Sequence, residues 1–215
     1  MDKSVYSLVL SDKVVAAVDD MAYRLGTSRS NLINQVLAEY VSLVTPEKRM
    51  KDIFDELEEL LLSDGYQIQP QPSDSMLSVK SVLRYKYKPT IRYSVELYRD
   101  FKDAFGEIRV VSRTQSQGLI DILESFYNIW TQIEMMRNKG AKITDNSFKV
   151  ENGKYLRQFV IASGCDSLTE EDIGKAIAEY VRCLDTAMKQ YFTDFDPMNV
   201  KRIYSRYLLT TDVIL

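Results

Sequence analysis

Histidine is absent from this 215-residue chain, and that absence excludes more kinds of site than any residue present. A serine-histidine-aspartate triad needs an imidazole, and so do most catalytic zinc and nickel centres. The eight glycines are scattered and form no phosphate-cradling loop. The sequence therefore predicts no metal and no cofactor.

Cysteines and long apolar runs are also scarce. Cys165 and Cys183 lack the spacing of a metal site, and we expect both to be reduced packing residues, with Cys183 on a helix. No apolar run reaches the roughly 18 residues that a membrane-spanning helix needs, and residues 1–4 do not resemble the start of a signal peptide. We therefore expect a cytoplasmic protein without a membrane partner.

Carboxylates are plentiful, but their spacing does not indicate catalysis. The pairs Asp55-Glu56 and Glu58-Glu59 fall on the outside of a predicted helix, where charged side chains are normally solvated. Nothing else in the chain forms a catalytic constellation, so we expect a protein that is not an enzyme.

The first 45 residues carry the clearest pattern, a short strand followed by two helices. Residues 5–10 alternate, so that Tyr6, Leu8 and Leu10 share one strand face. Ser11 is a good N-cap for a first helix, and Gly26 suits the left-handed position that ends it. Ser28 is a good N-cap for a second helix, which should run to about Leu43. Its predicted buried stripe comprises Leu32, Ile33, Val36, Leu37, Tyr40 and Val41.

This arrangement resembles the ribbon-helix-helix superfamily of MetJ/Arc/CopG-like repressors, on residues 7–11 and 21–33. The resemblance covers about a fifth of the chain. It implies that the strands of two copies pair into an antiparallel ribbon that enters the DNA major groove, while the start of the second helix binds phosphate. By position, the base-contacting residues would be Lys3, Val5, Ser7 and Val9. The phosphate-contacting residues would be Thr27, Ser28 and Arg29.

The sequence departs from the family pattern on the DNA-facing side of the strand. Val5 and Val9 stand where the family usually has side chains that hydrogen-bond to base edges, although valines can still pack on thymine methyl groups. Residues 1–45 hold four basic and five acidic side chains, so phosphate neutralisation would be modest and sensitive to salt. An alternative interpretation is therefore that the ribbon serves dimerisation alone.

The rest of the chain predicts an α+β domain. Pro46 opens a helix that ends near Ser63, and strand-like runs at 76–87, 90–98 and 107–113 suggest an antiparallel meander. A very apolar helix should follow at 119–136, then a hairpin that turns at Asn152-Gly153. Two further helices are predicted at 168–192, with Ser167 and Glu170 as a capping box, and from Pro197 to about Leu209.

A basic cluster stands out in this acidic chain, because residues 80–92 contain five cations and no acid. Its members are Lys80, Arg84, Lys86, Lys88 and Arg92. If the first strand runs to residue 87, then Arg84, Lys86 and Lys88 share one face of it. The cluster would be either a second anionic contact, to a ligand or to flanking DNA, or a plain solvated sheet face.

Together these features predict a fold of class α+β with two domains. Residues 1–45 would form a β-α-α ribbon-helix-helix unit, and residues 46–215 an α+β domain for dimerisation and for an effector or partner. We expect a homodimeric, sequence-specific transcriptional regulator of double-stranded DNA, with two dimers on adjacent half-sites. The alternative is a protein-interaction module, such as an antitoxin or a plasmid-maintenance or relaxosome accessory protein.

Overall fold

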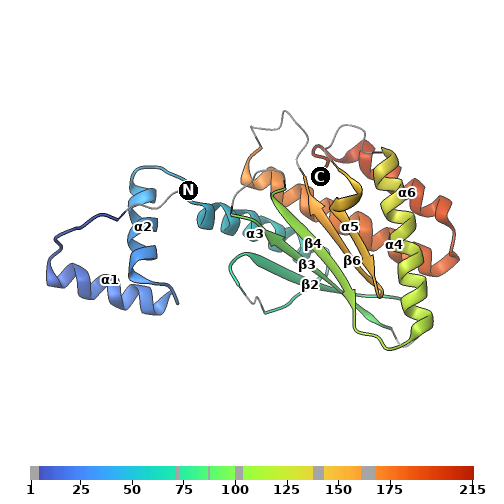
Figure 1. The fold of residues 1–215 in the computed structure, drawn as a ribbon, viewed down its shortest axis with the longest axis horizontal. Helices are drawn as coiled ribbons and strands as arrows, with labels where there is room; N and C mark the ends of the chain where they lie inside the picture. Colours follow the sequence, from blue (N-terminus) through green and yellow to red (C-terminus); the bar gives the residue numbers. More distant parts are fainter. Residues whose placement is uncertain (1–4, 71–72, 87, 100–103, 138–142, 161–167) are drawn as a thin grey trace. The chain divides into compact units, whose positions relative to one another are not determined.

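The computed structural model describes residues 5–70, 73–86, 88–99, 104–137, 143–160 and 168–215 (Figure 1). The chain divides into two compact units, Met1–Lys48 and Arg49–Leu215. The predicted domain boundary after residue 45 lies close to this division.

The α+β class is confirmed. The α-helices are α1 Asp12–Arg24, α2 Arg29–Tyr40, α3 Pro46–Ser63, α4 Gln117–Arg137, α5 Glu170–Asp194 and α6 Pro197–Thr210. The strands are β1 Gln67–Ile68, β2 Met76–Val82, β3 Thr90–Leu97, β4 Gly106–Ser112, β5 Phe148–Glu151 and β6 Lys154–Phe159. A short 3-10 helix, η1 Asp145–Ser147, precedes β5.

The first unit contains the two predicted helices. Gly26 adopts φ +62°, the left-handed conformation predicted for the residue that ends α1. Ser28 caps α2 as predicted, because its Oγ accepts a hydrogen bond from the amide of Asn31 at 3.2 Å. Ser11 is the N-cap of α1 but makes no side-chain capping bond. The second helix ends at Tyr40, earlier than predicted, and Ser42 then takes φ +55°.

The predicted strand at residues 5–10 is not formed in this single chain. Residues 5–11 have no regular secondary structure, and regular structure begins with α1. An isolated strand leaves its backbone amides and carbonyls without partners and buries little apolar surface, so it is not stable by itself. The β-α-α description of this unit is therefore corrected to two helices preceded by an extended segment.

The second unit is built on one antiparallel sheet with the strand order β1-β2-β3-β4-β6-β5. The predicted meander is confirmed as β2-β3-β4, with Val79 opposite Tyr93 and Tyr93 opposite Val110. Two details differ. The predicted loop after α3 contains the two-residue strand β1, which extends the sheet edge. The strand predicted for 76–87 ends at Val82, and the chain then turns, with Lys88 at φ +45°.

The hairpin β5-β6 forms as predicted, with its turn at Asn152-Gly153. Both turn residues have positive φ, 51° and 66°, which is the conformation of a type I′ turn. Strand β6 pairs on its other side with β4, and Tyr155 lies opposite Val110. The hairpin therefore extends the sheet beyond the meander.

Helices cover one face of this sheet (Figure 1). Tyr93 of β3 donates a hydrogen bond to Asp185 of α5, and Tyr155 of β6 stacks on Tyr127 of α4 at 5.1 Å between ring centroids. The register places Tyr93 and Tyr155 on the same face. Helix α4, predicted to be the central core helix, does enclose Trp130 fully, but more residues are buried on α5 than on α4.

The helix ends show which capping residues were predicted correctly from the sequence. Thr45 accepts a hydrogen bond from the amide of Lys48 at the start of α3, and Asp196 caps α6 just before Pro197. Helix α5 is capped by the reciprocal pair Thr169 and Asp172, not by the predicted Ser167 and Glu170. Ser167 lies outside the described residues, as does Cys165, whereas Cys183 is buried on α5.

No helix of the described residues is long and apolar enough to cross a membrane.

Candidate functional site

The base-contacting residues predicted from the resemblance lie in the extended segment ahead of α1. Val5 and Val9 are fully exposed, and Ser7 is exposed between them. Lys3 lies outside the described residues. The opposite set, Tyr6, Leu8 and Leu10, is also exposed, by 84%, 61% and 41%. In a single chain neither face of this segment is covered.

The predicted phosphate-contacting residues come together at the start of α2. Thr27 accepts a hydrogen bond from the side-chain amide of Asn31 at 3.0 Å, which together with the Ser28 cap fixes the first turn. Arg29, the first residue of α2, forms a two-pronged ion pair with Asp19 of α1, and its Nη2 lies 2.5 Å from Oδ2. The guanidinium and the carboxylate are both about half exposed. A phosphate at this helix end would have to compete with Asp19 for Arg29.

The first unit exposes an unusual amount of apolar surface. Of the 23 large hydrophobic side chains exposed among the described residues, 15 lie in residues 5–44. The first unit buries only three hydrophobic side chains among the described residues, namely Ala22, Leu32 and Ala38. The predicted buried stripe of α2 is thus largely uncovered, since Val36, Leu37, Tyr40 and Val41 are all exposed. Such a unit does not enclose a core of its own.

The basic cluster of residues 80–92 does not form one surface. Lys80 and Arg92 are cross-strand partners on the sheet face that α4 and α5 leave uncovered. Arg84, Lys86 and Lys88 lie after the end of β2, so the prediction that they share a strand face is wrong. Arg84 instead lines a pocket at the junction of β1, β2 and α5.

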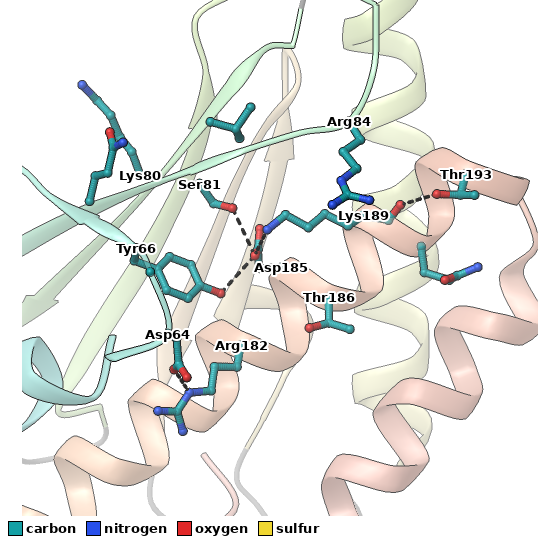
Figure 2. Close-up of a pocket in the computed structure, with 14 residues that line it drawn as sticks. Asp64, Tyr66, Lys80, Ser81, Arg84, Arg182, Asp185, Thr186, Lys189 and Thr193 are labelled. Carbon is teal, nitrogen blue, oxygen red and sulfur yellow. Dashed lines mark hydrogen bonds and ion pairs between the residues drawn. The ribbon is translucent and has the colours of Figure 1, made fainter. Parts of the chain in front are cut away.

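This pocket has a volume of about 770 Å³ and lies entirely within the second unit (Figure 2). Residues 64–67, 80–82 and 84 form one wall, and α5 forms the other. The α5 wall consists of polar side chains at helical spacing, namely Arg182, Asp185, Thr186, Lys189, Gln190 and Thr193. The volume falls in the range of small-molecule sites, about 300–1,000 Å³.

Asp185 is the centre of the pocket's hydrogen-bond network. Its carboxylate is 6% exposed and accepts bonds from the hydroxyls of Tyr66 (3.0 Å), Ser81 (3.1 Å) and Tyr93 (2.9 Å). Lys189, one helical turn further on, donates at 2.6 Å. A buried carboxylate with one cation and three hydroxyl donors is fully compensated. The network connects Tyr66, which lies just before β1, with β2, β3 and α5.

The two tyrosines of this network are held protonated. Burial and the adjacent Asp185 carboxylate raise the pKa of Tyr93 well above its usual value of 10, and the same causes raise the pKa of Tyr66. Both hydroxyls therefore remain hydrogen-bond donors across the physiological pH range.

Sequence patterns do not single out Asp185, Tyr66 or Lys189 as site residues. Each is unremarkable in its local pattern, and the group exists because β1, β2, β3 and α5 meet. One local signal was available: Asp185 directly follows Leu184 in the apolar stripe of α5, where an acid is costly unless it is paired. No group of three or more acidic or cysteine side chains in the described residues could hold a metal ion.

Comparison of the chain with protein-family models, with curated proteins and with solved structures gives no match. The candidate sites therefore rest on the residues and the geometry described above.

Proposed function

We propose that the chain is a homodimeric, sequence-specific DNA-binding protein, acting as a transcriptional regulator through its first unit. The observation that carries the proposal is the uncovered apolar surface of residues 5–44. Within it, residues 5–10 have the alternating pattern of a strand but pair with no strand of the described residues. A second copy of the same unit supplies both a partner strand and a partner apolar face.

Two paired segments would form a ribbon whose faces differ in chemistry. Tyr6, Leu8 and Leu10 would pack against the helices, because they are the larger apolar set. Val5, Ser7 and Val9 would then face outward, into a major groove that is wide enough for a two-stranded ribbon. Valine methyl groups would contact thymine methyls, and Ser7 would supply hydrogen-bonding readout.

The start of α2 would fix the ribbon on the DNA backbone. Its capped first turn presents amides at the positive end of the helix dipole, a favourable site for phosphate. Arg29 lies at the same place and is held there by Asp19. Phosphate would draw Arg29 away from an exposed ion pair of small energetic value, so the exchange costs little.

A protein-interaction module, of the antitoxin or accessory-protein kind, is the second candidate. It is favoured by the two fully exposed valines on the outward face and by the excess of one negative charge over residues 1–45. In that case the ribbon would hold two chains together and the second unit would bind a protein.

Selection of bound duplexes from a random DNA pool, at low and at physiological salt, separates the two. We expect a palindromic or tandem motif from the wild-type chain, lost with Ser7→Ala. Arg29→Ala should retain the motif but weaken binding to all sequences, because a phosphate contact carries no base information. Arg206→Ala, an exposed change on α6, is the control and should behave as wild type. Enrichment of no sequence at either salt concentration would reject DNA recognition and favour the second candidate.

A further inference from the structure

The pocket beside Asp185 has polar groups beyond those that its own network uses. Lys189 binds Asp185, and Arg182 binds both Asp64 and the main-chain oxygen of Leu60. Arg84 makes no ion pair with a carboxylate of the described residues, and the Thr186 hydroxyl has no hydrogen bond to them. Two solvent-exposed donors are therefore left without a protein partner among the described residues, on opposite walls of the pocket.

The charge of the cavity favours an anion. Lys80, Arg84, Arg182 and Lys189 oppose Asp64 and Asp185, which leaves an excess of two positive charges on the lining. Asp185 is deeply buried beneath its four donors, and Asp64 is already paired with Arg182. An incoming anion would thus meet neutralised carboxylates and a free guanidinium.

The geometry places that guanidinium over the cavity. Figure 2 shows the Arg84 side chain reaching from the segment after β2 toward Lys189 and Asp185. Thr186 lies on the facing helix α5, about one helical turn before Lys189. An arginine fork and a hydroxyl on opposite sides suit a tetrahedral or planar oxyanion, since guanidinium groups bind phosphate with two parallel hydrogen bonds.

We propose that this pocket binds a phosphorylated small molecule, with Arg84 as the principal phosphate ligand and Thr186 as a second donor. The polar stripe Thr186, Gln190 and Thr193 then faces the hydroxyl-bearing remainder of the ligand, and the volume accommodates a sugar phosphate or a nucleoside monophosphate. This site lies wholly in the second unit and does not depend on the DNA-binding proposal.

Calorimetric titration of the full chain tests the proposal directly. The probes are ribose 5-phosphate and adenosine monophosphate, each compared with its unphosphorylated form, and inorganic phosphate. We expect saturable binding of phosphorylated probes and none of ribose or adenosine. Arg84→Gln should weaken the affinity about tenfold or more, since a hydrogen bond to a charged group contributes about 1.5–3 kcal/mol and each 1.4 kcal/mol is a factor of ten. Arg84→Lys should recover part of the loss, and Thr186→Val should weaken binding by a smaller factor.

Arg206→Gln, which removes an exposed charge outside the pocket, is the matched control and should leave the affinity unchanged. DNA is the other source of phosphate, so each variant is also titrated with a mixed-sequence duplex. Two results would overturn the proposal: phosphorylated probes that fail to bind the folded wild-type chain, or an Arg84→Gln chain that loses duplex affinity while its affinity for the small probes is unchanged.

Discussion

Arg157 of β6 and Glu134 of α4 form an ion pair inside the core of the second unit, with their side chains 1% and 0% exposed and Nε 2.5 Å from Oε2. Tyr180 donates to the second oxygen of Glu134, and its ring lies 4.7 Å from the guanidinium carbon. Arg157 also donates to the main-chain oxygen of Leu215, whose side chain is buried in the same core. Burial lowers the pKa of Arg157, but the Glu134 carboxylate together with Tyr180 and Tyr155 outweighs burial, so the pKa lies above its usual value.

Glu134→Gln should therefore destabilise the second unit strongly. The change keeps the shape of the side chain but removes the carboxylate side chain that pairs with the buried Arg157, which costs about 3–5 kcal/mol of unfolding free energy. Urea unfolding of the full chain measures the effect. Lys51→Gln, which removes an exposed pair with Asp55 on α3, should change stability by less than about 1 kcal/mol. Equal effects of the two substitutions would contradict the assignment of Glu134 as the essential counter-ion.

Two buried tyrosines offer a comparison between a paired and an unpaired hydroxyl. Tyr93→Phe removes a donor to the Asp185 carboxylate and should cost about 1.5–3 kcal/mol. The Tyr127 hydroxyl is buried with no hydrogen-bond partner in the described residues. Tyr127→Phe should accordingly be neutral or stabilising, because an unsatisfied polar group is removed. Thermal unfolding of both variants gives the comparison, and a larger loss for Tyr127→Phe would refute it.

Cys183 should be chemically inert in the folded protein. It is buried on α5, and burial together with the nearby Glu134 raises the pKa of its thiol well above the usual value of 9, which suppresses the reactive thiolate. In a Cys165→Ser chain, an aromatic disulfide reagent at pH 8 should modify Cys183 at the rate of unfolding, and immediately in denaturant. Fast labelling in buffer would contradict the burial of Cys183.

Ser7→Pro tests whether the first unit pairs two chains through residues 5–10. Proline removes a backbone donor from the centre of the proposed ribbon, so the dimer should dissociate more readily in sedimentation equilibrium. The control is Ser7→Ala, which keeps the backbone donor and should remain dimeric. Ser205→Pro would not serve as a proline control, because Ser205 lies inside helix α6. A Ser7→Pro chain as dimeric as wild type would assign dimerisation to the second unit.

Local patterns predicted most of the elements because their signals lie within a few residues. Apolar spacing located the helices, and Asn152-Gly153 located the hairpin, where both residues do adopt positive φ. The predicted ends of helices were less accurate where two nearby residues could both act as the N-cap, as at the start of α5. The two-residue strand β1 has no periodicity at all, and its pairing with β2 depends on where α3 delivers the chain.

The charged groups of the second unit were harder to predict because their partners are distant in the sequence. Arg157 lies on the same strand face as Tyr155 and Phe159, so the two-residue periodicity of a strand places it on the buried face. Nothing in the local sequence indicates Glu134 as its counter-ion. The basic cluster illustrates the opposite error. Its members are close in sequence, yet Lys80 and Arg92 are cross-strand neighbours within the sheet, whereas Arg84 lies after the end of β2 and lines the pocket.

Amide hydrogen exchange of residues 5–10, in the free protein and bound to a selected duplex, tests the central claim most directly. In a two-stranded antiparallel ribbon every second amide bonds to the partner strand. We predict slow exchange at alternate residues of this segment in the free dimer, and still slower exchange in the DNA complex. Uniformly fast exchange in both states would show that residues 5–10 form no ribbon, and would contradict DNA recognition through it.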